Sequence, residues 1–157
     1  MSEPAALFPP GFDETPLRRA LDCLREGFQI VGFDWKYLYV NPAAARHGRR
    51  TPGELVGRAM AEMYPGIDQT YLFTVLRRAM EERTSHVFEN LFMFPDGSTR
   101  WFELRVQPVP EGICIYSADI DARKRAELAR QHDANVIRRT PVGSRLRSAL
   151  SRAFGGT

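Results

Sequence analysis

The chain has 157 residues, of which 43% are hydrophobic and 26% charged, and its formal net charge is +3. This composition is that of an ordinary globular domain. The chain is long enough to bury a hydrophobic core without help from disulfides or metals. Two cysteines do not make a disulfide framework. No apolar run suits a signal peptide, and none is as long as the roughly 18 residues that a membrane helix needs. We therefore expect one cytoplasmic domain.

The charge is divided unevenly along the chain. Residues 1–121 hold 13 basic and 17 acidic side chains, a net charge of −4, whereas residues 122–157 hold nine and two, a net charge of +7. A basic segment attracts nucleic acid or an anionic membrane in a salt-sensitive way. Phe154 is its one aromatic residue, so base stacking is not indicated. We therefore expect residues 122–157 to form a solvated helix with a frayed end rather than a binding site for nucleic acid or a membrane.

The first elements follow local capping signals. Residues 1–14 are rich in proline and glycine, which predicts a flexible leader. Thr15, followed by proline, predicts the cap of a helix over 15–26, and Gly27 predicts its end. The apolar stripe of this helix comprises Leu17, Leu21 and Leu24.

Two short strands and two short helices come next. The stretches 28–33 and 37–40 are rich in β-forming residues. Asn41 precedes Pro42, which predicts a helix over 42–47, and Thr51 with Glu54 forms a capping box that predicts a second.

The second half of the chain predicts a long helix, three strands and a basic helix. Apolar residues recur at helical spacing within 68–83. The stretches 86–94, 99–109 and 113–120 are separated by turn sequences, and the pattern after Asp121 is helical to about Arg139. Strand 99–109 alternates, so that one face carries Phe102, Leu104 and Val106 and the other Trp101, Glu103, Arg105 and Gln107.

This order resembles the PAS (Per-Arnt-Sim) sensor domain of bacterial histidine kinases and related two-component signalling proteins. Three stretches carry the resemblance: "YVNPAAARHGRRTPGELVGR", "FPDGSTRWFELRVQPV" and "ADIDARKRAE". The last is similar to the family's closing D-I-T-E-R-K-x-A-E, although Asp121 and Ala122 stand where Thr and Glu are usual. The resemblance covers roughly residues 16–127.

The resemblance implies an α+β fold, with a five-stranded antiparallel sheet, helices packed on one face, and flanking N- and C-terminal helices. We expect a domain over 15–121, followed by a basic exit helix and tail over 122–157. It also implies sensing of a small ligand or a partner, usually as a homodimer. We expect the dimer interface to include Leu17, Leu21, Leu24 and Trp101. The candidate pocket lies between the long helix and the inner sheet face, and its predicted lining residues are Ile30, Leu72, Leu76, Phe102 and Leu104.

No cofactor is expected. The stretch "AEMYPGIDQ" lacks the reactive cysteine that flavin-binding members need, and the long helix lacks a histidine for haem. His86 follows that helix and is predicted to be structural or solvated, and His47 is predicted to lie on the surface. The three histidines are scattered, so no metal site is predicted. No Ser-His-Asp or Cys-His arrangement is legible, so no catalytic residues are predicted.

We therefore predict a stand-alone sensory or interaction domain without enzymatic activity. Its signal leaves through the junction formed by Asp119, Asp121 and Arg123 and is read by a separate protein. One alternative is the detached sensor module of a histidine kinase or cyclase. Another is an adaptor for nucleic acid or a membrane surface, driven by the basic tail.

Overall fold

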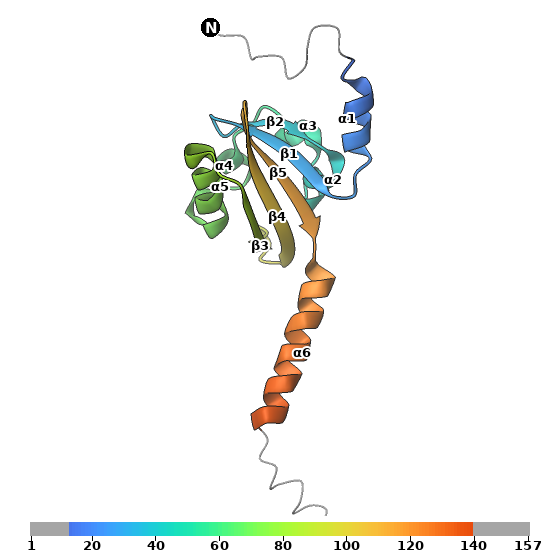
Figure 1. Cartoon of the computed structure of the whole chain (residues 1–157), viewed down its shortest axis with the longest axis vertical. Coiled ribbons are helices and arrows are strands. Elements are labelled where there is room, and N and C mark those ends of the chain that lie inside the picture. The colour runs from blue at the N-terminus through green and yellow to red at the C-terminus, as the bar shows by residue number, and fades with distance from the viewer. Residues whose placement is uncertain (1–12, 140–157) are drawn as a thin grey trace, which may run out of the picture. The chain divides into compact units, whose positions relative to one another are not determined.

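The computed structural model describes residues 13–139, and the predicted leader up to residue 12 and the tail beyond 139 lie outside them. The chain divides into a unit that ends at Ile120 and a unit that begins at Asp121 (Figure 1). The first unit contains α1 (Thr15–Asp22), β1 (Gly27–Gly32), β2 (Tyr37–Val40), α2 (Pro42–His47), α3 (Pro52–Leu55), α4 (Met60–Met63), a 3-10 turn η1 (Ile67–Gln69), α5 (Tyr71–Glu82), β3 (His86–Met93), β4 (Thr99–Val109) and β5 (Gly112–Asp119). The second contains α6 (Asp121–Arg139).

The five strands form one antiparallel sheet in the order β2-β1-β5-β4-β3. The first strand, β1, pairs with the last strand, β5, and β5 is the central strand of the sheet. The predicted α+β fold with a five-stranded antiparallel sheet is confirmed, and so are the flanking helices.

One face of the sheet packs against the helices (Figure 1). The alternation predicted for residues 99–109 is observed, since Phe102, Leu104 and Val106 are buried and Arg105 is exposed. The largest apolar side chains that are almost fully buried come from both layers: Val31, Leu55, Met60, Leu76, Val106 and Ile113. Because successive side chains of a strand point to opposite faces, the alternation in β4 places its apolar residues on the sheet face that packs in the core.

The N-terminal helix is shorter than predicted. It ends at Asp22 rather than at residue 26, and Thr15 is its first residue rather than its cap. The cap position is Glu14, whose side chain makes no capping bond, and the Thr15 N–H donates to the Asp13 carboxylate over 2.9 Å. The link that follows is held by Asn41, whose amide donates to the carbonyl oxygens of Leu21 and Glu26 over 2.9 and 3.0 Å.

The other caps agree with the sequence. Asn41 caps α2 and Thr51 caps α3, each accepting a backbone N–H three residues ahead. The long helix starts at Tyr71 rather than at residue 68, because Thr70 is extended and its hydroxyl accepts from the Phe73 N–H over 3.2 Å. The short elements α4 and η1, which were not predicted, lie between α3 and α5.

Candidate ligand cavity

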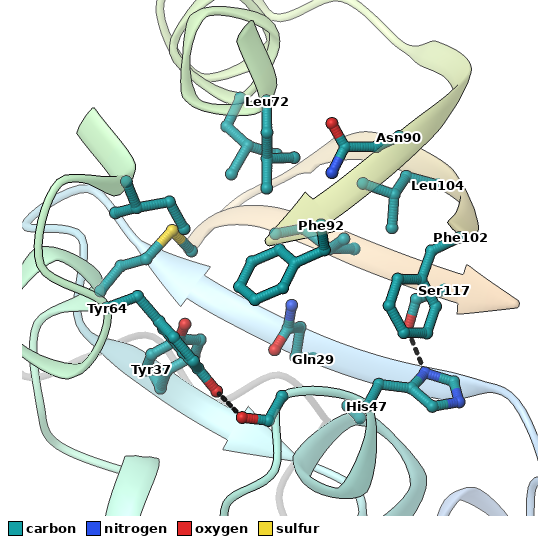
Figure 2. A pocket seen from close by; sticks show the side chains of 16 residues that line it. Gln29, Tyr37, His47, Tyr64, Leu72, Asn90, Phe92, Phe102, Leu104 and Ser117 are labelled. Atoms are coloured by element: carbon teal, nitrogen blue, oxygen red, sulfur yellow. Dashed lines mark hydrogen bonds between the residues drawn. The ribbon is translucent and has the colours of Figure 1, made fainter. Parts of the chain in front are cut away.

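A cavity of about 80 Å³ lies between the helices and the inner face of the sheet (Figure 2). Helices α2, α4 and α5, the turn η1 and all five strands contribute to its wall. The lining residues are Gln29, Tyr37, Ala44, His47, Gly48, Met60, Tyr64, Ile67, Leu72, Leu76, Asn90, Phe92, Phe102, Leu104, Ile115 and Ser117.

Four of the five predicted lining residues lie in this wall: Leu72, Leu76, Phe102 and Leu104. Ile30 does not, and its assignment to the pocket was wrong. Because successive side chains of a strand point to opposite faces, the neighbouring Gln29 occupies the inner face instead. Ile30 is paired with Cys114 on the other face and is half-buried.

His47 was predicted to lie on the surface, but it is half-buried and lines the cavity. Its Nδ1 lies 3.0 Å from the Ser117 hydroxyl, and its ring centroid is 4.9 Å from that of Phe102. Burial lowers the pKa of His47, and the negative charge of Asp119 opposes this shift only in part. The imidazole is therefore neutral at pH 7.

Tyr64 and Gly48 form another part of the wall. The Tyr64 hydroxyl donates to the Gly48 carbonyl oxygen over 3.0 Å (Figure 2). Burial raises the pKa of Tyr64 to about 12. A Cβ atom at residue 48 would lie 2.0 Å from the Tyr64 hydroxyl, so only glycine permits this approach.

A wider groove of about 830 Å³ adjoins the cavity. It runs between the α4–α5 connection and β3, and it is lined by Arg50, Thr70 and Asn90 together with mostly apolar residues. Five residues belong to both walls: Tyr64, Ile67, Leu72, Asn90 and Phe92. The groove and the cavity are therefore separated only by these shared side chains.

Sequence reasoning missed the polar part of the wall. Gln29 lies two residues before the fully buried Val31 on the same face of β1, but the sequence alone does not show which face that is. No local signal identifies His47, since its partners Phe102 and Ser117 lie far along the chain. Within residues 13–139, no three His, Cys, Asp or Glu side chains gather in a way that could hold a metal ion.

The predicted junction residues lie at the end of β5 and the start of α6. Asp119 pairs with Arg100 of β4 over 2.6 Å. Asp121 opens α6 and pairs with Arg125 over 2.7 Å, and Arg123 lies 4.0 Å from Glu127.

The residues predicted for a dimer interface are only partly covered. Leu17 is 41% and Leu24 38% exposed, and Leu21 and Trp101 are half-buried. In the described residues, no helix is long and apolar enough to span a bilayer.

An antiparallel sheet with helices packed on one face and a small cavity between the two layers defines an α+β domain. The chain belongs to the PAS family, because a family model described as "PAS fold" matches residues 7–125. It is therefore a sensory signalling domain.

Solved structures share this fold. The PAS domain of a Colwellia psychrerythraea protein has a TM-score of 0.57 and 15% identity, with 70% of this chain and 99% of that chain covered. A domain of a sensory box sensor histidine kinase/response regulator from Geobacter sulfurreducens has a TM-score of 0.55 and 21% identity, covering 68% and 93%. An RNA-binding light-oxygen-voltage receptor has a TM-score of 0.65 and 19% identity, covering 85% and 40%. These identities establish the fold alone. A search of the curated proteins finds no match.

Proposed function

We propose that this PAS domain binds a small molecule in the cavity and passes the resulting change to a partner protein through its C-terminal helix. The observation that carries the proposal is a cavity whose wall joins α2 and α5 to the strand that leads into α6. A guest in the cavity touches both layers of the domain at once.

The route to the exit runs along β5. Ser117 contacts His47 in the cavity wall, and two residues later Asp119 pairs with Arg100 at the strand end. The Arg100 and Asp119 side chains are 50% and 32% exposed, so this ion pair contributes only about 0–1 kcal/mol. A ligand whose affinities for two conformations differ by a comparable free energy is enough to shift the strand end.

We assign no catalytic step to the domain. The lining residues include no carboxylate, thiol, lysine or arginine. The Ser117–His47 contact uses Nδ1, and no carboxylate in the wall could orient the imidazole, so the pair lacks the third group of a hydrolytic triad.

A bound flavin or haem is not part of the proposal. The cavity wall contains no cysteine, and its one histidine, His47, already contacts Ser117 through Nδ1. We expect the purified protein to be colourless, and an absorption band between about 400 and 450 nm, the range of haem and flavin, would overturn this expectation.

We further propose that the domain acts as a homodimer that uses α1 and the outer sheet face. The outer side of β3 exposes three apolar side chains, Val87 (66%), Leu91 (45%) and Met93 (70%). Leu91 is paired with Trp101, and the stripe of α1 adds Leu17 and Leu24. Apolar patches of this kind favour protein–protein contact.

Native mass spectrometry of the gently purified protein tests the central proposal by detecting a retained small molecule. Hydrogen exchange across residues 121–139 is then compared between loaded protein and protein emptied by unfolding and refolding. We expect the two to differ in the exchange of α6. Identical exchange in loaded and emptied protein would show that the cavity does not communicate with the exit helix.

A further inference from the structure

Three polar side chains in the cavity wall have no internal partner. Tyr37 is 3% exposed, yet no group within residues 13–139 forms a hydrogen bond with its hydroxyl, and the same holds for the side-chain amides of Gln29 and Asn90. Figure 2 shows the polar ends of Gln29 and Tyr37 turned toward the cavity. Tyr37 is buried and Gln29 and Asn90 are half-buried, so their donors and acceptors are open to a guest or to water that enters the cavity.

Tyr37 and Gln29 line the same cavity from the neighbouring strands β2 and β1. Tyr37 is paired with Val31 across β1 and β2, and Gln29 lies two residues before Val31 on the same face. In a regular antiparallel pair such diagonal neighbours are about 7–8 Å apart, which aromatic and long side chains span. Here the register shifts between Ile30 and Val31, within the same short stretch of β1. Asn90 lies on β3 and also lines the groove, so it belongs to the mouth of the cavity.

The wall offers no charge to an ionic guest. None of its sixteen residues is Asp, Glu, Lys or Arg. Burial lowers the pKa of His47 and raises the pKa of Tyr37, which keeps both side chains neutral at pH 7. An ion would lose its hydration here without a counter-charge, which costs several kcal/mol.

The volume sets the size of the guest. A cavity of about 150 Å³ holds benzene, and this one measures about 80 Å³. It therefore accepts about three or four non-hydrogen atoms, or two to three waters of about 30 Å³ each. A longer molecule would place its remainder in the adjoining groove.

We propose that, within the sensory function proposed above, the cavity recognises an uncharged primary amide group, held by the carboxamide of Gln29 and the hydroxyl of Tyr37. A primary amide carries both a donor and an acceptor, and so does the Gln29 carboxamide, so the two pair through complementary bonds. The hydroxyl of Tyr37 donates or accepts as the guest requires. The apolar remainder of the wall, such as Leu76 and Ile115, excludes water from the contact.

Three isosteric probes test the ligand class: acetamide, acetone and acetate. Each has four non-hydrogen atoms, so the ligand-efficiency ceiling limits Kd to no tighter than about 40 µM, and we expect millimolar values. Titration up to about 100 mM, followed by amide NMR shifts of the lining residues, covers this range. We expect acetamide to bind most tightly, acetone several-fold more weakly and acetate at least tenfold more weakly.

Two variants locate the contact. Tyr37→Phe should weaken acetamide binding by about threefold to tenfold, because it removes one hydrogen bond of about 0.5–1.5 kcal/mol. The matched control is Tyr64→Phe, which lines the same cavity but already donates to Gly48 and should change the acetamide Kd by less than about twofold.

The amide assignment is overturned if acetate binds as tightly as acetamide, if no probe shifts the lining residues, or if Tyr37→Phe leaves acetamide binding unchanged. These outcomes are separable from failure of the sensory function. A charged molecule retained in native mass spectrometry would reject the amide and keep the sensor, whereas acetamide binding without any change in α6 exchange would keep the amide and reject the sensor.

Discussion

We predict that truncation of Asn41 lowers the free energy of unfolding more than truncation of any other side chain of similar size. Asn41 is fully buried. Its Oδ1 accepts from the backbone N–H groups of Phe28 and Ala44, each over 2.9 Å. Its Nδ2 donates to the carbonyl oxygens of Leu21 and Glu26 over 2.9 and 3.0 Å. One amide thus caps α2, binds β1 and holds the link after α1.

Replacing Asn41 by alanine removes all four hydrogen bonds. Loss of a helix cap costs about 1 kcal/mol, and each further internal bond contributes about 0.5–1.5 kcal/mol. Water reaches some of the freed groups, since Leu21 and Glu26 are only half-buried. We therefore expect Asn41→Ala to lower the free energy of unfolding by about 2–4 kcal/mol, measured by urea denaturation at neutral pH.

Two comparisons sharpen this test. Asn41→Asp keeps the two accepted bonds but turns a carboxylate oxygen toward two carbonyl oxygens, which raises the pKa of the new carboxyl group. Its stability should therefore fall as the pH rises through that raised pKa and recover at lower pH, where the protonated acid donates one bond. Asn90→Ala is the matched control, because the Asn90 amide makes no hydrogen bond within residues 13–139. A cost for Asn41→Ala below about 1 kcal/mol, or one no larger than that of Asn90→Ala, would refute the reasoning.

Four further predictions follow from the cavity and the surface. In thermal or urea unfolding, Tyr64→Phe should destabilise by about 1 kcal/mol while Tyr37→Phe is neutral or stabilising, because only the first loses an internal bond; equal costs would contradict this. Because the pKa of His47 is lower in the folded than in the unfolded chain, the unfolded chain binds a proton first as the pH drops. The free energy of unfolding should therefore fall below about pH 6.5. Denaturation at pH 7 and pH 5 should show that His47→Gln loses most of this dependence. Sedimentation should show a dimer whose Kd rises at least tenfold in Trp101→Ala; a strictly monomeric wild type at high concentration would end the dimer proposal. Asp119→Ala should alter exchange in residues 120–137 or partner capture while the core stays folded, and no change in either would make the junction a mere strand end.

Much of the fold was predictable because the relevant forces are local. The cap of α2 is set by the side chain of Asn41 and the N–H three residues ahead, which are neighbours in the sequence. The bounds of α2, β2, β4 and α6 were predicted correctly for the same reason, since helical and strand periods need no distant partner.

The errors arose where a distant partner decides the outcome. The end of α1 depends on Asn41, which is 20 residues from Leu21. Ile30 was assigned to the pocket for its apolar side chain, but the register of β1 against β5 places Gln29 on the inner face. Hydrophobicity alone does not give the inner face of a strand that carries apolar residues on both sides, as β1 does with Ile30 and Val31.

The sequence by itself determined the order of elements, most of their caps and the core face of β4, because these depend on intervals of two to four residues. Only the tertiary structure decided the chemistry of the cavity. The sheet brings Ser117 to within 3.0 Å of His47, 70 residues away, and pairing of β1 with β2 places Tyr37 and Gln29 on one wall. The sequence does not show whether a polar side chain lies on the surface, where water solvates it, or in a cavity, where it selects a ligand. Desolvation, which depends on the whole fold, separates the two.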